Sequence, residues 1–195
     1  MRFGNTSMNN DNFKSFGPGA LEKAISFNHH DIFVSQQNQK PYSDTGCGVA
    51  CLFMLLKFIQ LQPLPTWKDL CDALKLDVSP IKKGYSIDDP EIGLYPEDLF
   101  RYVIQQNLPF RMQFFDDEWE ASLKNVPIMV LLDGILKEFP NEAHWVVLIA
   151  YKNKQFTYLD PWYEEEKDYL KTISWTKFKS HYTGVACQLL KKEIF

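Results

Sequence analysis

The longest apolar run of the chain begins at a cysteine that has a glycine on each side. From Cys47 to Ile59 the sequence reads CGVACLFMLLKFI, in which Lys57 is the one charged residue. A helix with almost no polar face must be buried on nearly all sides. The pattern therefore predicts a buried helix over 47–59 and places the Cys47 thiol at its start.

Capping residues mark the starts of further helices. Thr66 stands three residues before Asp69, which is close to a capping box, and Pro96 suits the first position of a helix. Ser174 is a good N-cap for the last helix. Besides 47–59, the predicted helices are 20–27, 66–76, 96–107, 116–124 and 174–182.

Segments with strand character dominate the second half of the chain. A turn at 152–154 separates HWVVLIAY from QFTYLD, which predicts a β-hairpin. The predicted strands are 31–36, 127–133, 144–151, 155–160 and 185–190. Helices that come mostly first and antiparallel strands that come mostly second indicate an α+β fold. The stretch 79–93 is broken by Gly and Pro and has no periodicity, so we expect a long loop, a feature that is often functional.

The composition describes one folded domain and excludes several classes of protein. The chain has 195 residues, a hydrophobic fraction of 45% and a net charge of −4, without the basic surface that nucleic-acid binding requires. No apolar run is long enough for a membrane span, and the N-terminus lacks a signal peptide, so we expect synthesis in the cytoplasm. Residues 1–30 are expected to form a flexible extension, followed by a domain over 31–195.

The four cysteines differ in their surroundings. None forms a CxxC pair, so a structural zinc site on cysteines is not expected. Cys51, Cys71 and Cys187 lie within apolar helix or strand patterns and are predicted to be core thiols. Cys47 alone has glycines on both sides. Packing would explain it, but a thiol at a helix N-terminus is also activated as a nucleophile by the helix dipole.

A base for such a thiol is His144, which follows the polar segment EFPNEA and opens an apolar strand. Cysteine catalysis needs a base and a third group that holds the base in the right tautomer. In the predicted hairpin a strand's first residue lies across from its partner's last, which brings His144 beside Asp160. Taken alone, Asp160 is better explained as the start of a turn with Pro161, but the glycine-flanked cysteine and the well-placed histidine together favour the catalytic interpretation. The remaining histidines are expected at the surface or at a helix end: His29, His30 and His181.

An oxyanion donor completes a site of this kind. Acyl transfer commonly uses a side-chain amide together with the backbone N–H of the nucleophile. The segment before Cys47 offers four amides, and their positions alone do not choose among them. They are Gln36, Gln37, Asn38 and Gln39.

Four segments together resemble the double-glycine, bacteriocin-processing cysteine peptidases of the papain-like superfamily. They are IFVSQ, CGVACLFMLLKF, HWVVLIAY and YLDPW, in this order, and the similarity extends from Ile32 to Leu190. In that family a short strand ends in the oxyanion glutamine and CG-x-ACL-x-M opens the nucleophile helix. The resemblance implies a papain-like fold, in which the nucleophile stands at the N-terminus of a buried helix packed on an antiparallel sheet.

The resemblance also implies roles for residues of this chain. Cys47 matches the nucleophile, His144 the general base and acid, and Asp160 the orienting carboxylate, with no cofactor and no metal. Gln36 matches the oxyanion glutamine, while the long loop between Gln36 and Cys47 leaves Gln39 as the alternative donor.

A preference for Gly-Gly sites would require a narrow cleft. The long loop over 79–93 lies between the nucleophile and the base in the sequence, and we expect it to form one wall of that cleft. Tyr85 and Tyr95 are the predicted contacts of this wall with the substrate.

The sequence shows no membrane-spanning or P-loop segment after the peptidase pattern, so it resembles free-standing papain-like toxins that competing bacteria deliver. One kind of these toxins cuts type II DNA topoisomerases at a double-glycine site. We therefore expect an effector delivered by a secretion system, with type II topoisomerase subunits as possible substrates and an immunity protein as its inhibitor. A deamidase or acyltransferase with the same triad, a housekeeping leader peptidase and an inactive binding module stay open as alternatives.

Overall fold

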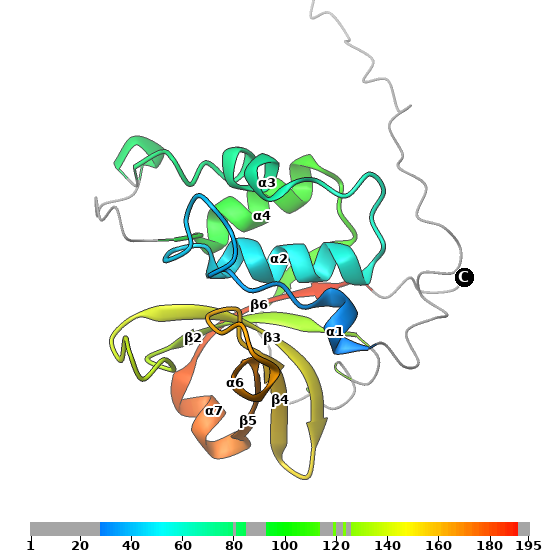
Figure 1. The fold of residues 1–195 in the computed structure, drawn as a ribbon, viewed down its shortest axis with the longest axis vertical. Coiled ribbons are helices and arrows are strands. Elements are labelled where there is room, and N and C mark those ends of the chain that lie inside the picture. The colour runs from blue at the N-terminus through cyan, green and yellow to red at the C-terminus, as the bar shows by residue number, and fades with distance from the viewer. Residues whose placement is uncertain are drawn as a thin grey trace, which may run out of the picture.

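The structure, a computed structural model, describes residues 28–79, 81–84, 93–113, 119, 123 and 126–190. Within these residues a six-stranded antiparallel sheet has the strand order β1-β6-β2-β3-β4-β5. Helices α2, α3 and α4 lie on one side of the sheet, and α7 lies on the other (Figure 1). This arrangement confirms the predicted α+β fold.

The helices 47–59, 66–76, 96–107 and 174–182 and the strands 127–133, 144–151, 155–160 and 185–190 are present in the predicted order, with differences at their ends and with further elements between them. The helices are α1 (His29–Ile32), α2 (Cys47–Phe58), α3 (Trp67–Ala73), the 3-10 helix η2 (Ile81–Lys83), α4 (Pro96–Gln105), α6 (Glu166–Tyr169) and α7 (Trp175–His181). The strands are β1 (Phe110–Gln113), β2 (Ile128–Asp133), β3 (Ala143–Lys152), β4 (Gln155–Leu159), β5 (Leu170–Ser174) and β6 (Tyr182–Leu189). The predicted caps are present at α3, where Thr66 and Asp69 form a full capping box, and at α7, where Ser174 accepts a hydrogen bond from the Lys177 N–H.

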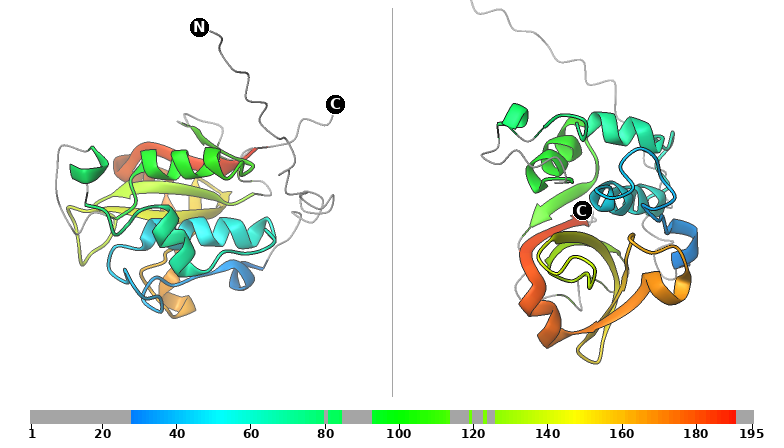
Figure 2. Two further views of the ribbon diagram at one scale, coloured as in Figure 1. Left: turned by 90° about the horizontal axis from the view of Figure 1, so that it is seen from above. Right: turned by 60° about the vertical axis from the view of Figure 1, so that its left-hand side comes forward.

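The sheet lies between two hydrophobic cores, and the side chains of β3 point alternately into one core and the other. Trp145 and Val147 pack in the core that contains α2, whereas Val146 and Leu148 face the core that contains Phe178 of α7. The sheet curls around this second core, as the right-hand view in Figure 2 shows. Helix α2 is buried along most of its length, as its apolar sequence predicts.

The glycines beside Cys47 have a packing function. A Cβ on Gly46 would lie 2.5 Å from the Tyr42 carbonyl oxygen and 2.8 Å from the Trp67 ring. A Cβ on Gly48 would lie 2.6 Å from the Leu94 Cβ and 2.9 Å from the Trp145 ring. Both glycines therefore let neighbouring segments approach the first turn of α2 closely and fix the position of Cys47.

The predicted strand over 31–36 is wrong. Helix α1 ends at Ile32, and the residues after it belong to no strand. Asn28 starts this short helix by accepting a hydrogen bond from the His30 N–H. The chain then runs along the segment after β4, where the Gln36 N–H donates to the Pro161 carbonyl at 2.8 Å. Its alternating apolar residues thus pack in a core without joining the sheet.

Other expectations fall partly or wholly outside the described residues. The helix over 20–27 lies outside them, as do most of the helix over 116–124 and positions 80 and 85–92 of the long loop. The predicted extension 1–30 lies outside them up to residue 27, and its last two residues belong to α1. Strands β1 and β5 were not anticipated. Both are short and outermost in the sheet, so they carry little of the alternation that identifies a strand.

Among the described residues, no helix is both long and apolar enough to span a bilayer.

Candidate active site

Cys47 is the first residue of α2, directly after the N-cap Gly46. Its side chain is almost buried, and it lines the same cleft as His144, whose pKa it helps to raise. The apolar residues that follow in α2 pack the helix against the sheet, while Gly48 lets its first turn approach Trp145 at the start of β3. The buried helix thus places the Cys47 thiol next to the His144 imidazole at the edge of the sheet.

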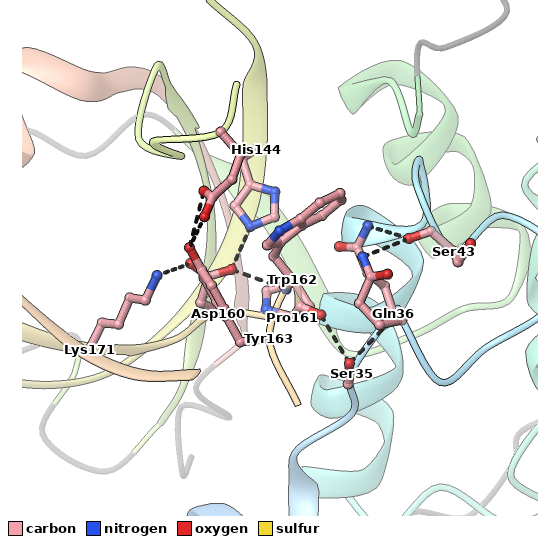
Figure 3. Close-up of polar contacts among 11 residues, drawn as sticks. Ser35, Gln36, Ser43, His144, Asp160, Pro161, Trp162, Tyr163 and Lys171 are labelled. Carbon is pink, nitrogen blue, oxygen red and sulfur yellow. Dashed lines mark hydrogen bonds and ion pairs between the residues drawn. The ribbon is translucent and has the colours of Figure 1, made fainter. Parts of the chain in front are cut away.

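The hairpin of β3 and β4 brings His144 and Asp160 together. The His144 Nε2 lies 2.7 Å from the Asp160 Oδ1, and both side chains are buried (Figure 3). A carboxylate only accepts hydrogen bonds, so Nε2 carries a proton and Nδ1 is left for the thiol proton. The contact between the two side chains was predicted from the hairpin.

The register of the hairpin differs from the simple prediction. Val147 pairs with Leu159, and the register shifts between Leu148 and Ala150. Extending the pairing by one residue places Asp160 opposite Val146, two positions from His144 and on the same face of β3. The two residues therefore meet as diagonal neighbours, a separation that long side chains can bridge.

Two further groups fix the Asp160 carboxylate. Its Oδ1 also accepts from the Trp162 backbone N–H at 3.1 Å, and its Oδ2 accepts from the Lys171 Nζ at 3.1 Å (Figure 3). Lys171 comes from β5, and its ammonium group lies 3.5 Å from the centre of the Tyr163 ring. Each carboxylate oxygen thus has a named donor, and Asp160 cannot turn without losing one of them.

The surroundings of His144 and Asp160 favour the charged form of each side chain. Burial by itself lowers the pKa of His144, but the charge and hydrogen bond of Asp160, together with Cys47, raise this pKa to about 10. Burial would raise the pKa of Asp160, yet the charge and hydrogen bond of His144, Lys171 and the Trp162 N–H bring it below its usual range. An imidazolium facing an ionised carboxylate is therefore the stable form at neutral pH.

A cleft of about 420 Å³ opens over Cys47 and His144. One side is formed by the segment before α4, where the Trp145 Nε1 donates to the Leu94 carbonyl at 2.9 Å. On the other side the rings of Phe139 and Trp162 meet edge to face, with centroids 5.1 Å apart. The cleft is lined by Asp44, Thr45, Cys47, Gly93, Leu94, Tyr95, Pro96, Leu131, Leu136, Phe139, Asn141, Glu142, Ala143, His144, Trp145 and Trp162. The cleft thus offers apolar and aromatic surface on both sides of the thiol.

The predicted oxyanion glutamine is fully buried and is not among the residues that line this cleft. The Gln36 Nε2 donates to the Ser43 carbonyl at 2.7 Å, while its buried Oε1 has no hydrogen-bond partner (Figure 3). Its backbone N–H is bonded to Pro161, next to Asp160. Gln39, the alternative donor, is half-buried. Its backbone N–H donates to the Gln36 carbonyl at 3.0 Å. The role of Gln36 stays a prediction.

The two predicted cleft tyrosines have different outcomes. Tyr95 lines the cleft and is the N-cap residue of α4. Tyr85 lies outside the described residues.

The remaining cysteines are core residues, as predicted. Cys51, Cys71 and Cys187 are all buried and free of disulfides. Burial raises the pKa of Cys71 to about 11 and that of Cys187 to about 12. Burial, with Cys47 and Asp160 beside it, raises the pKa of Cys51 well above its ordinary value. These thiols stay protonated, which leaves Cys47 as the candidate nucleophile.

Sequence reasoning missed Lys171 and the roles of Phe139 and Trp162. Lys171 comes from a strand that was not predicted, so nothing placed it beside Asp160. Trp162 follows the Asp-Pro pair directly in the sequence, and this position was the one available signal of its closeness to the site.

The chain is similar to known peptidases in sequence pattern and in fold. The sequence model of the Peptidase_C39 like family matches residues 30–190. A protein from Bacillus anthracis classed as a C39-like peptidase shares the fold, with a TM-score of 0.59 and 18% identity over 82% of this chain and 94% of the other. A double glycine motif protease from an AMS/PCAT transporter, solved in complex with the leader peptide, has a TM-score of 0.51 and 18% identity over 82% of this chain and 91% of the other. No curated protein matches the chain.

Proposed function

This chain belongs to the Peptidase_C39 like family and is a papain-like cysteine peptidase; we propose that Cys47, His144 and Asp160 are its catalytic triad. One observation carries the proposal. The His144 imidazole hydrogen bonds to the Asp160 carboxylate, and the Cys47 thiol lines the same cleft as the imidazole and helps to raise its pKa. Nucleophile, base and orienting group are thus arranged in the order that covalent catalysis requires.

The reaction proceeds through an acyl-enzyme. With the thiol proton already on His144, Cys47 attacks the scissile carbonyl carbon as a thiolate. The resulting imidazolium gives its proton to the leaving amine as the C–N bond breaks. Water then attacks the thioester with His144 as base, which releases the new carboxyl end and restores the thiol. Asp160 keeps the imidazole in the required tautomer and stabilises its charged form.

The oxyanion is held by the Cys47 backbone N–H at the start of α2 and by the side-chain amide of Gln36. The amide nitrogen carries two protons, and the Ser43 carbonyl accepts one of them. The second proton is the one proposed to bind the oxyanion, which requires the buried side chain of Gln36 to reach the cleft when substrate binds. The helix N-terminus adds positive potential at the same place.

We assign the cleavage site to the bond after Gly-Gly. Two observations support this specificity. Tyr95 and Trp162 stand on the walls of the cleft, and bulky aromatic walls favour residues without side chains next to the scissile bond. In addition, one protein of the same fold is a double glycine motif protease that was solved with a leader peptide.

A map of new protein N-termini in bacterial lysate tests this function. Wild-type protein should create termini that follow Gly-Gly, and Cys47→Ala should create none. New termini that do not follow Gly-Gly would overturn the proposed specificity but would still show that the protein is a peptidase. Intact chain lengths together with small mass changes on target proteins would instead support the deamidase or acyltransferase alternative.

The role as an interbacterial toxin rests on the resemblance alone and stays a prediction. An interbacterial toxin should inhibit growth when produced inside a bacterium, and Cys47→Ala should remove the effect. Type II topoisomerase subunits should then appear among the cleaved proteins, and an immunity protein should restore growth. Normal growth with efficient cleavage of secreted leader peptides would favour the housekeeping leader peptidase.

A further inference from the structure

A second cluster of chemically active side chains joins α1 to α6, away from the cleft. The Nε2 of His29 lies 3.0 Å from the Glu166 Oε1, and the Nε2 of His30 lies 3.1 Å from the same oxygen. One ligand atom from each of these three residues lies within 4.8 Å of the other two. We propose that His29, His30 and Glu166 form a binding site for a divalent transition metal ion, with Zn²⁺ as the ion that fits best.

The separations suit a shared ion. Zinc binds imidazole nitrogen and carboxylate oxygen at about 2.0–2.2 Å, so two ligands of a tetrahedral ion lie roughly 3.3 Å apart. The two nitrogen–oxygen separations found here are close to that value. Two imidazoles and one carboxylate form a ligand set that zinc uses with a water molecule in the fourth position. Because His30 and Glu166 are exposed, water can reach the open position.

One histidine already has the support that metal ligands require. The His30 Nδ1 lies 2.9 Å from the Tyr169 hydroxyl. When Nε2 binds a metal, the neutral ring keeps its proton on Nδ1, and that N–H donates to an acceptor which fixes the orientation of the ring. The Tyr169 oxygen is in the right place to accept it. The Tyr169 ring is itself held by stacking on Phe33, with centroids 3.6 Å apart.

The surrounding charge also favours a cation. Asp31 follows the two histidines, and Glu164, Glu165 and Asp168 surround Glu166 in the sequence. The neighbouring Lys167 is paired with Glu165 at 2.8 Å, so it does not neutralise Glu166. The site therefore lies in a locally acidic region, which raises the local concentration of divalent cations.

Metal at this position would connect α1 to α6, and each of these segments is bonded through its backbone to the chain around Asp160. After α1 the chain leads to Gln36, whose N–H donates to the Pro161 carbonyl. Before β5, the Tyr169 carbonyl accepts from the Asp160 N–H at 2.9 Å. An ion held by His29, His30 and Glu166 would stabilise this pair of segments in the folded protein, since any ligand that binds the native state alone stabilises it.

The test uses full-length Cys47→Ala protein, because a free catalytic thiol would bind zinc by itself. Calorimetric titration with zinc chloride should give one site, and the melting temperature should rise as zinc is added. In the same background Glu166→Gln, and separately His30→Gln, should weaken binding at least tenfold and remove the rise. Tyr169→Phe should weaken it about 10- to 100-fold, the usual cost of losing a partner that orients a ligand. His181→Gln, in a histidine bonded to the Asp133 carbonyl, is the matched control and should leave binding unchanged.

Absence of zinc binding by Cys47→Ala would overturn the proposal. So would binding of equal affinity in Cys47→Ala and in folded Glu166→Gln or His30→Gln. The melting temperatures without metal show whether each variant is folded, and having two variants guards against one that is not. None of these measurements depends on peptidase activity, so their outcome is separate from that of the proposed function.

Discussion

Lys171 holds the carboxylate of Asp160 from the side opposite His144. Its Nζ lies 3.1 Å from Oδ2, while the imidazole nitrogen lies 2.7 Å from Oδ1. The lysine also lies over the Tyr163 ring, whose hydroxyl donates to Glu138 at 3.2 Å. Asp160 is therefore bound on both of its oxygens, and Lys171 acts on the proposed triad as a positioning residue.

Replacement of this lysine should change the pH dependence of the enzyme. Lys171 is among the groups that lower the pKa of Asp160, so in Lys171→Met this pKa should rise. The triad needs an ionised Asp160, and the acidic limb of the kcat/KM profile should therefore move to higher pH. The measurement is peptide cleavage between pH 4 and 8.

The exposed Lys177→Met is the control for a general change of charge, and its profile should match that of the wild type. If Lys171→Met lowers the rate equally at every pH, the lysine has a purely structural role.

Conversion of Asp160 to its amide should preserve the shape of the site and remove most of its activity. In Asp160→Asn, the imidazolium loses the negative charge beside it, and an amide nitrogen turned towards the ring would force the wrong tautomer; in the worked serine protease case this change lowers kcat by about 10⁴-fold. We expect a large loss of kcat with KM little changed, measured on a Gly-Gly peptide. Asp133→Asn, at the exposed end of β2, should retain full activity. Retention of activity by Asp160→Asn would show that an acceptor oxygen is sufficient to orient His144 and that the charge of Asp160 is not required.

The sequence was sufficient for the pairing of His144 with Asp160 and for the position of Cys47. Local signals carried these predictions: an apolar run behind a glycine-flanked thiol, and two strands separated by a short turn. The contact survived an error in register, because Asp160 lies opposite Val146, two positions from His144 and on the same face of β3. A diagonal pair still lies within reach of a histidine side chain.

The sequence was not sufficient for α1 or for Lys171. The residues from Asp31 to Gln36 alternate like a strand, yet the N-cap of Asn28 and packing against the segment after β4 decide their conformation. Lys171 approaches Asp160 through the pairing of Tyr158 with Lys171 between β4 and β5. This contact depends on which strands are neighbours in the sheet, and no local pattern encodes that.

Any side chain in place of Gly48, the glycine after the nucleophile, should destabilise the folded protein. In Gly48→Ala the new Cβ would meet the Leu94 Cβ at 2.6 Å and the Trp145 ring at 2.9 Å. Overpacking of this kind costs about 1–3 kcal/mol, which corresponds to a fall in melting temperature of roughly 2–12 °C for a domain of this size. Activity should fall as well, because Leu94 lines the cleft. An unchanged melting temperature would show that the α2–β3 contact is looser than described.

His144 should stabilise the folded protein less as the pH rises into the alkaline range. Its folded pKa of about 10 lies above the value of about 6.5 expected for an unfolded chain. A group with a raised pKa contributes stability fully below the unfolded value and loses it as the pH rises through the folded value. The difference in melting temperature between the wild type and His144→Gln should therefore be largest near pH 6 and shrink towards pH 10.5. A difference that stays constant over this range would show that His144 is not held as a cation.

The two candidate glutamines can be separated by their effect on kcat. Gln36 is buried and donates one amide proton to Ser43, which leaves the second for an oxyanion, whereas Gln39 is half-buried. Loss of one oxyanion donor lowers kcat by about 10²–10³-fold because the donor acts on charge that develops only in the transition state. We therefore expect a fall of this size, with KM nearly unchanged, in Gln36→Ala and wild-type kinetics in Gln39→Ala. The reverse result would make Gln39 the donor, and its side chain would then have to turn into the cleft when substrate binds. Equal activity of both variants would leave the Cys47 backbone N–H and the N-terminus of α2 as the main stabilisers of the oxyanion.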